Sequence, residues 1–444
     1  MEHITKAVEK HTQMILDAER WIWKHPETGF KEVETSAYMA EKFRALGYEL
    51  TMAEGITGFY TVIDTGRPGP EVMVLGELDS IICPAHPECN PVTGAVHSCG
   101  HNAQCAALLG IAAALKEPGM LDGLCGRIRL VAVPAEELLE IGYRTKLREE
   151  GKIKYFGGKT EFLYRGYFDG VDIAFMAHTG GSFSVHAGDV GCLSKRIIYK
   201  GTAAHAGGAP WDGHNALYAA NCGLNAVNAI RETFPESDII RVHPIITKGG
   251  DMVNAIPGEV ILESYVRGSS FKAIVKANKK VNRAFTGAAL SLGTNIEIID
   301  LPGYGPLRND PNMMDLAEEA VKTIMPDEWF GRGTQIGSGS TDMGDLSAVM
   351  PVVHPYAKGA KGKGHGADYR IDNPMTACVG SAKMQLAMLN ILLRDDAARA
   401  KKVIAEYKPE FASKKEYFEF LDTLACSGDR IEYREDGTVN VRAD

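Results

Sequence analysis

Cys99 and His101 are the residues of this sequence whose types and spacing most directly offer chemistry. They lie two positions apart, with Gly100 between them, so an extended backbone projects both side chains to the same side. A thiolate and an imidazole in this arrangement can bind one divalent metal ion or a pair of them. An isolated Cys-Gly-His is more often a buried cysteine beside a core histidine, so the interpretation depends on the rest of the chain.

Other residues with ligand or proton-transfer chemistry follow three apolar, strand-like runs: Asp79 after Val72–Leu75, Glu136 and Glu137 after Arg127–Val133, and His178 after Val171–Met176. Strand-like runs alternate with helix-like segments, which predicts a mostly parallel α/β sheet. Ligands of such sheets bind at the carboxyl ends of the strands. We therefore expect these four residues to lie close together.

The adjacent acids Glu136 and Glu137 have two interpretations. They are typical of a charged helix start, where acids favour the helix dipole. Beside a Cys/His metal site, one acid can ligate the ion while the other accepts a proton from water held there.

Two histidines near the end of the chain compete for a late ligand position. His365 lies in the Gly-rich loop Lys363–Ala367, which permits close approach to an ion, and is favoured over His354. The segment Cys83–Cys89, with His86 at its centre, has the spacing of a zinc knot. Its two prolines and the lack of a fourth ligand favour a surface loop.

The pattern changes between residues 188 and 302, which we expect to form an inserted domain. Six elements follow in the order β-α-β-β-α-β: strand Leu193–Lys200, helix Asn215–Arg231, strands Ile239–Thr247 and Glu259–Arg267, helix Phe271–Leu292 and strand Asn295–Asp300. This order predicts a split βαβ sandwich. Residues 1–187 and 303–444 are assigned to the α/β domain. Elements expected there include a helix over residues 4–23, the helix Thr376–Leu393 and a hairpin over Arg430–Val441 with a type I′ turn at Asp436-Gly437.

Composition limits the class of protein. A chain of 444 residues is too long for one core, and 45% hydrophobic with 24% charged residues is typical of a soluble globular protein. A net charge of -9 argues against a nucleic-acid partner. We expect no signal peptide and no membrane span, because no apolar run is long enough. Nine scattered cysteines favour the reducing cytoplasm.

The inserted region contains three polar residues at element edges: His205 in a loop of small residues, Asn254, and Arg267 at a strand end. Each alone is more often structural than functional. The Gly/Ser turn Gly337–Asp345 is a weak candidate for binding a substrate through backbone amides.

Nine stretches together resemble the two-metal aminoacylase/carboxypeptidase family of metallopeptidases, within it the amidohydrolase branch of hippurate, auxin-conjugate and aminobenzoyl-glutamate hydrolases. In the family's order they are HPETGFKE, GELDS, HSCGHN, VPAEE, MAHTG, GTAAHAG, VNAIPGEV, GSTDMGD and GHGADY. Asn102 and Gln104 replace the Asp and second His usual in the first two types, so the chain looks closer to the aminobenzoyl-glutamate type. The resemblance implies a zinc-peptidase-like α/β domain with an inserted ferredoxin-like dimerisation or lid domain.

The resemblance also implies roles for individual residues. It implies that Cys99 bridges two divalent ions, zinc or manganese. His101 and His178 would complete the ligands of one ion, and Glu137 and His365 those of the other. The other implied roles are Glu136 as general base, Asp79 as a carboxylate orienting a ligand, His205 as a donor to the partner subunit's active site, and Asn254 and Arg267 as holders of the substrate carboxylate.

The expected reaction is hydrolysis of the amide between an acyl or aroyl group and an amino acid, by a homodimer formed through the inserted domain. A dipeptidase or aminopeptidase of the same fold is an alternative, and needs an acidic group facing a free α-amine. A metal-stabilised binding protein is a third. Glu136 beside Glu137 argues against it, since a structural site is closed and needs no base.

Overall fold

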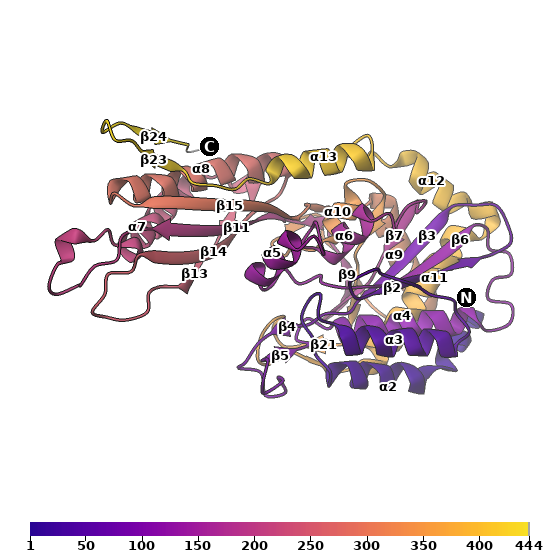
Figure 1. Ribbon diagram of the computed structural model, residues 1–444. Helices are drawn as coiled ribbons and strands as arrows, with labels where there is room; N and C mark the ends of the chain where they lie inside the picture. Colours follow the sequence, from indigo (N-terminus) through magenta and orange to yellow (C-terminus); the bar gives the residue numbers. More distant parts are fainter. Residues whose placement is uncertain (443–444) are drawn as a thin grey trace. The chain divides into compact units, whose positions relative to one another are not determined.

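The computed structural model describes residues 1–442, and the chain divides into two compact units (Figure 1). Unit 1 comprises Met1–Gly188, Leu307–Gly337 and Thr341–Ala412. Unit 2 comprises Asp189–Pro306, Ser338–Ser340 and the chain from Ser413 onward.

Unit 1 is built on a six-stranded sheet of order β1-β2-β6-β3-β7-β19. Its strands are β1 (Thr51–Met52), β2 (Phe59–Asp64), β3 (Glu71–Glu77), β6 (Arg127–Val133), β7 (Ile173–Phe175) and β19 (Val352–Val353). The pairs β3–β6, β3–β7 and β7–β19 are parallel, whereas β1 and β2 add antiparallel at one edge. Every residue of β3 is buried, because a central parallel strand is covered on both faces. The expected α/β class is confirmed.

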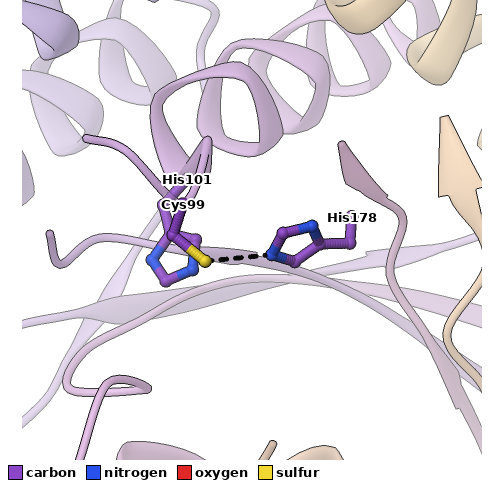
Figure 2. Close-up of side chains that lie close together, drawn as sticks. All are labelled: Cys99, His101 and His178. Carbon is purple, nitrogen blue, oxygen red and sulfur yellow. Dashed lines mark hydrogen bonds between the residues drawn. The ribbon is translucent and has the colours of Figure 1, made fainter. Parts of the chain in front are cut away.

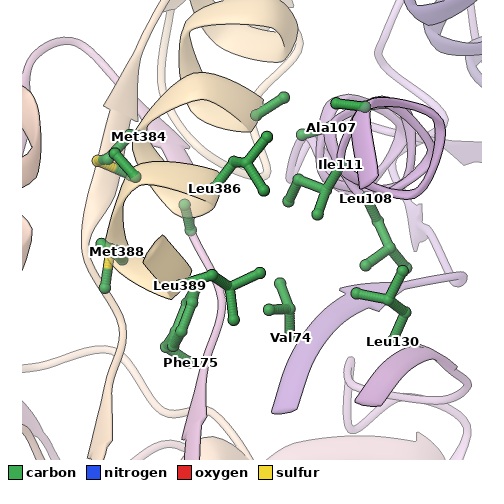
Figure 3. Packing of buried hydrophobic residues seen from close by; sticks show 14 of the residues in the cluster. Val74, Ala107, Leu108, Ile111, Leu130, Phe175, Met384, Leu386, Met388 and Leu389 are labelled. Carbon is green, nitrogen blue, oxygen red and sulfur yellow. The ribbon is translucent and has the colours of Figure 1, made fainter. Parts of the chain in front are cut away.

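Helix α4 (His101–Leu115) is buried along its whole length, with no residue exposed to solvent. A helix that is apolar all round must be enclosed by other elements. Figure 3 shows how these apolar side chains pack together: Ala107, Leu108 and Ile111 of α4, Leu386 and Leu389 of α11 (Ser381–Leu393), and Val74, Leu130 and Phe175 of the sheet. This packing holds the amino end of α4, which carries His101, in a fixed position.

The other helices of unit 1 are α1 (Glu2–Glu9), α2 (Thr12–Trp23), α3 (Val33–Ala45), α5 (Ile141–Glu149), α6 (Gly158–Tyr164), α9 (Pro311–Ile324), α10 (Met343–Ser347) and α12 (Ala398–Glu406). Figure 1 shows α2 and α3, in indigo, beside α4. The single helix expected over residues 4–23 is wrong, because the chain breaks between α1 and α2 at Lys10 and His11. One helical stretch of the described residues, Met375–Leu393, is long and apolar enough to cross a membrane, but 83% of its apolar window is buried inside the protein.

Short sheets of unit 1 position the segments that contain Cys83, His178 and His365. A four-stranded sheet of order β17-β9-β20-β8 contains His178 at the start of its last strand. Its strands are β8 (His178–Gly180), β9 (Phe183–Val185), β17 (Phe330–Arg332) and β20 (Tyr356–Lys358). Two-stranded sheets frame the loops around Cys83 and His365, namely β4 (Ile81–Ile82) with β5 (Ala95–Val96), and β21 (Ala360–Lys361) with β22 (Arg370–Ile371). A further sheet joins β16 (Leu307–Arg308), β10 (Gly188–Asp189) and β18 (Ile336–Gly337).

Unit 2 contains an antiparallel sheet of order β12-β14-β11-β15, with β13 also paired to β14. Its elements are β11 (Gly191–Lys200), α7 (Ala216–Ala229), β12 (Arg241–Val242), β13 (Ile245–Lys248), β14 (Glu259–Gly268), α8 (Phe271–Ser291) and β15 (Asn295–Tyr304). Buried residues alternate along β14, so one face of the sheet packs against α7 and α8. The β-α-β-β-α-β order is the one expected. The strand expected over Ile239–Thr247 is split at Pro244, which has no N–H to donate.

The carboxyl-terminal segment differs from the expected domain boundary. The sequence pattern places residues 303–444 in the α/β domain, yet the chain from Ser413 onward belongs to unit 2. The reason is that this segment adds to the edge of β15, where Cys426 N–H donates to the carbonyl oxygen of Asp300 at 2.9 Å. Helix α13 (Lys414–Leu424) also contacts α8 through the rings of Phe420 and Phe271, which meet edge to face.

The expected hairpin is present as β23 (Ile431–Tyr433) and β24 (Val439–Val441), but its turn is not the two-residue type I′. Arg434 N–H donates to the carbonyl of Thr438, and Gly437 N–H donates to the carbonyl of Arg434, both at 3.0 Å. The loop therefore has three residues and ends on Gly437 at φ 81°, the conformation that glycine adopts without strain.

Candidate metal centre and active site

The ligand atoms of five expected residues converge in unit 1. Two groups of three have ligand atoms within 4.8 Å of one another, Cys99 with His101 and His178, and Cys99 with Glu137 and His365. Cys99 Sγ lies 3.3 Å from His178 Nε2. Figure 2 marks this contact with a dashed line. His365 Nε2 lies 3.0 Å from Glu137 Oε1. Cys99 belongs to both groups and is the one residue of the five that can contact two ions.

Gly100 makes the close spacing of Cys99 and His101 possible. It is the N-cap residue of α4 and has φ 88°, in the left-handed region. A Cβ at this position would collide with the hydroxyl groups of Thr179 and Tyr369. Only glycine satisfies both conditions, so the turn between the thiol and the first histidine depends on it.

Asp79 connects the two groups. Its Oδ2 accepts from the backbone N–H of Glu137 at 2.8 Å. Its carbonyl oxygen and Oδ1 lie 2.9 and 3.2 Å from His101 Nδ1. Because both atoms are acceptors, Nδ1 of the neutral ring carries the proton and Nε2 is the nitrogen available to a metal.

The structure brings His365 to the site and not His354. The backbone N–H of His365 donates to the carbonyl of Ser98 at 2.8 Å, and φ of 62° turns its ring towards Glu137. His354 is buried, with its ring 5.7 Å from that of His178, and belongs to none of the ligand groups found within residues 1–442.

The acidic groups and the thiol have perturbed pKa values. Burial raises the pKa of Cys99 well above its ordinary value, and the charge of Glu137 adds to this effect. Burial, followed by the charges of Glu77 and Glu137, raises the pKa of Glu136 well above its usual range. A nearby cation would favour the ionised form of each group.

Other groups are already in the form that binds metal. Burial and the nearby charge of His101 lower the pKa of His178, so its imidazole is neutral. Burial opposes ionisation of Glu137, but the hydrogen bond and charge of His365 outweigh it and hold the pKa at about 2. Metal ligands must be deprotonated, so this donor set fits divalent cations.

Comparison with known proteins agrees with this geometry. The model of peptidase family M20/M25/M40 matches residues 37–390. The chain belongs to this family. The family expected from the sequence motifs is therefore confirmed.

Individual M20 proteins show how far the similarity extends. Xaa-Arg dipeptidase of Homo sapiens is 32% identical over 307 residues, covering 68% of this chain and 65% of the relative. The chain thus spans less than two thirds of that relative's own length. One of the two p-aminobenzoyl-glutamate hydrolase chains of Escherichia coli (strain K12) is 28% identical over 357 residues, covering 67% of this chain and 76% of the relative. A solved Bacillus subtilis protein, described as a dinuclear metal binding peptidase from the M20 family, superposes with TM-score 0.63 at 20% identity, covering 87% of this chain and 99% of that one.

Three buried charged residues of this M20 chain were not expected at the site. Lys159 Nζ donates to carboxylates of both Glu77 and Asp342, and the three side chains have no solvent exposure. Burial opposes the charge on Lys159, but the carboxylates of Asp342 and Glu77 outweigh it and raise its pKa. Burial raises the pKa of Asp342 to about 6. Glu77 and Asp342 lie within the motifs GELDS and GSTDMGD, whereas the sequence around Lys159 gives no signal.

Glu32 is another buried acid that sequence reasoning missed. Its Oε1 accepts from the backbone N–H of Ala135 at 2.7 Å, and its Oε2 accepts from the Thr57 hydroxyl at 2.6 Å. Ala135 has φ 56°, an uncommon conformation for a residue other than glycine. The Glu32 carboxyl group thus holds the strained turn that immediately precedes Glu136.

We expect Glu32→Gln to flatten the pH dependence of stability. Burial, with the charge of Asp79, raises the pKa of Glu32 from 4.5 to about 8. The folded state therefore holds this proton more tightly, and that stability is present below pH 4.5 and lost as pH rises through about 8. The whole shift corresponds to roughly 5 kcal/mol, of which roughly 3 kcal/mol is lost between pH 6 and pH 9. Urea unfolding at pH 6 and pH 9 measures it, and an equal loss in wild type and variant would contradict the assignment.

His205 and Asn254 come together in unit 2. Their segments pair through Ala206 N–H, which donates to the carbonyl of Asn254 at 2.9 Å. His205 is exposed, and its Nδ1 accepts from the backbone N–H groups of Gly207 at 3.1 Å and Gly208 at 2.9 Å. With Nδ1 used as an acceptor, the neutral ring carries its proton on Nε2. His205 therefore presents an N–H donor.

Arg267 also lies in unit 2, near the end of β14. Its Nη1 donates to the hydroxyl of Ser340 at 3.3 Å, and its guanidinium lies 5.4 Å from the ring centre of Tyr265. Within residues 1–442 no carboxylate forms an ion pair with it. The guanidinium and the Ser340 hydroxyl are thus available to a carboxylate ligand.

The loop interpretation of Cys83–Cys89 is supported. His86 Nε2 donates to the carbonyl of Tyr369 at 2.9 Å, and its Nδ1 accepts from Glu88 N–H at 3.1 Å. Both ring nitrogens are used, so His86 is unavailable to a metal.

Proposed function

We propose that the protein is a metal-dependent amidohydrolase that cleaves the amide bond of N-acyl or N-aroyl amino acids and releases a carboxylic acid and an amino acid. The observation that carries this proposal is the convergence of two ligand groups on Cys99 beside Glu136. The similarity to the p-aminobenzoyl-glutamate hydrolase of E. coli supports an aroyl amino acid as substrate.

The proposed cofactors are two divalent metal ions, zinc or manganese. Cys99 would contact both, with His101 and His178 on one side and Glu137 and His365 on the other. The B. subtilis neighbour described as dinuclear supports this number. When bound, such ions lower the pKa of a coordinated water and polarise a carbonyl oxygen.

Glu136 is the proposed proton acceptor. Its Oε2 lies 3.9 Å from His101 Nε2, close to the ligand atoms, yet it belongs to neither group that contains Cys99. It would take the proton of the attacking water and pass it to the leaving amine. Asp79 keeps His101 and Glu137 oriented during this transfer.

Residues of unit 2 are proposed to bind the substrate. His205 Nε2–H would donate to the oxyanion that forms on the carbonyl carbon, in the active site of the partner subunit. Arg267, with Asn254, would hold the carboxylate of the leaving amino acid, a planar contact that lysine cannot reproduce.

The proposed assembly is a homodimer formed through unit 2. Among the described residues, strand β13 pairs with β14 alone, and its four residues are exposed. Large apolar side chains are also exposed in this unit, among them Trp211 at 78%, Ile245 at 61% and Val253 at 100%. An exposed apolar edge strand is a natural site for pairing with a second chain.

We expect the double variant Ile245→Lys/Ile246→Lys to weaken the dimer by at least about 10-fold, since edge lysines oppose strand pairing. Turnover should fall with it, because His205 would no longer reach a partner. Sedimentation equilibrium measures the assembly, and Val92→Asp, at an exposed position of unit 1, is the control. A stable, active dimer of the double variant would place the interface elsewhere.

The proposed location is the cytoplasm. All nine cysteines are free thiols in the structure, which favours a reducing compartment. With a net charge of -9, neither nucleic acid nor a membrane is a proposed partner.

A dipeptidase is the second candidate, favoured by the similarity to Xaa-Arg dipeptidase. The test compares p-aminobenzoyl-glutamate and other N-acyl amino acids with free-amine dipeptides, including ones that end in arginine, after loading with zinc or manganese. Higher kcat/KM for the acylated compounds supports the amidohydrolase. Higher kcat/KM for the free amines supports the dipeptidase, and metal binding without turnover of either class would favour a binding protein.

A further inference from the structure

Glu77 places an unpartnered carboxylate oxygen at the metal centre. It is the last residue of β3 and has no solvent exposure. Its Oε1 accepts from Lys159 Nζ. Its Oε2 has no hydrogen-bond donor and points towards His101, with 3.1 Å between Oε2 and Nε2.

The approach of Glu77 to His101 lacks the geometry of a hydrogen bond, and His101 Nε2 is likewise without a hydrogen-bond partner. Among residues 1–442 these two atoms therefore face each other at ligand distance without a hydrogen bond, and Glu136 Oε2 lies 3.9 Å from the same His101 nitrogen. Two atoms bound to one ion at about 2.0–2.2 Å are separated by about 3–3.5 Å, which matches the observed distance.

The contacts of the other Glu77 oxygen lead to the same position. Lys159 lies between Glu77 and Asp342 and binds Oε1, so Oε2 is the Glu77 oxygen left to face His101. Glu77, His101 and Glu136 have ligand atoms within 4.8 Å of one another, a spacing that fits one bound metal ion.

We propose that Glu77 is an additional metal ligand, which binds through Oε2 on the His101 side of the centre. This inference rests on the proposed function, because it requires that the centre bind metal. Lys159 acts as a positioning residue, which turns the other Glu77 oxygen away from the ion. A carboxylate added to the thiolate and imidazoles of Cys99, His101 and His178 gives this side four protein donors and broadens its metal preference towards manganese or cobalt.

The test measures metal binding and not activity. Purified Glu77→Gln is dialysed against zinc and, separately, cobalt, and metal content and the cobalt absorption spectrum are recorded. We expect one of the two sites to lose about 10–100-fold in affinity, with a changed cobalt spectrum. Asp342→Asn is the matched control, because it removes the other carboxylate bound to Lys159 without facing His101. It should keep the wild-type spectrum.

The outcomes separate this inference from the proposed function. Wild-type affinity and spectrum in Glu77→Gln would overturn the additional ligand alone. Failure of the wild-type protein to bind any divalent ion would overturn the proposed function as well. Glu77→Gln could fail to fold because Lys159 loses a partner. In that case Glu77→Gln/Lys159→Met removes both charges, and its metal content and cobalt absorption spectrum test whether Glu77 is a ligand.

Discussion

Glu136→Gln is expected to lower kcat by about 10²–10⁴-fold while both metal ions remain bound. Glutamine keeps the size of the side chain but cannot accept the proton of the attacking water. Glu136 is outside the two groups that share Cys99, so metal content should be close to that of the wild type. Steady-state kinetics and metal analysis on the same sample measure both quantities.

The adjacent residue provides the matched control for this experiment. Glu137 belongs to the group with Cys99 and His365, so Glu137→Gln should lose affinity for one of the two ions. Metal content should therefore fall in Glu137→Gln and stay unchanged in Glu136→Gln. Turnover near the wild-type level in Glu136→Gln would remove that residue as the base.

Residues at the ends of parallel strands could be predicted to converge from the sequence. The runs before Asp79 and Glu137 are apolar and β-rich, and they form β3 and β6, which pair in parallel. Their carboxyl ends therefore meet, and the hydrogen bond from Glu137 N–H to Asp79 Oδ2 follows from that topology. The motif order favoured His365 over His354 as the late candidate ligand, a choice that strand patterns alone would not have made.

Contacts between distant polar residues could not be predicted in this way. Lys159 is 82 positions from Glu77 and 183 from Asp342 along the chain. Glu32 is 103 positions from the N–H group of Ala135 that it binds. No periodicity links such pairs, and a lysine or glutamate on its own predicts solvent exposure. Only the packed structure shows that Lys159 is buried between two carboxylates and that Glu32 is buried against a backbone N–H and a hydroxyl.

Helix ends and domain boundaries that no glycine or proline marks could not be predicted from the sequence either. The break between α1 and α2 falls at Lys10 and His11, where His11 and Lys10 side chains contact Glu117. The chain from Ser413 onward joins unit 2 because it pairs with β15, a long-range contact that local sequence does not encode. Both differences arise from tertiary contacts that override local preference.

Cys99→Ala is expected to remove metal from both sites and to reduce turnover to below about 1% of wild type, since each ion would lose a ligand and, with it, activation of the water. Cys99 is shared by the group that contains His101 and His178 and the group that contains Glu137 and His365. His178 and His365 each belong to one of these two groups. Single substitutions of either histidine should therefore lower the affinity of one ion only. Metal content after dialysis, measured alongside kcat, distinguishes the shared ligand from the others.

The control for losing a buried thiol is Cys378→Ala. Cys378 is fully buried in the apolar core and lies outside the ligand groups found in residues 1–442. Its replacement should lower the free energy of unfolding by about 1 kcal/mol and leave two ions bound. If Cys99→Ala also retained two ions, the thiol would not bridge them. The two groups would then have to bind their ions independently, and the common centre inferred from the 3.3 Å approach of Cys99 to His178 would be wrong.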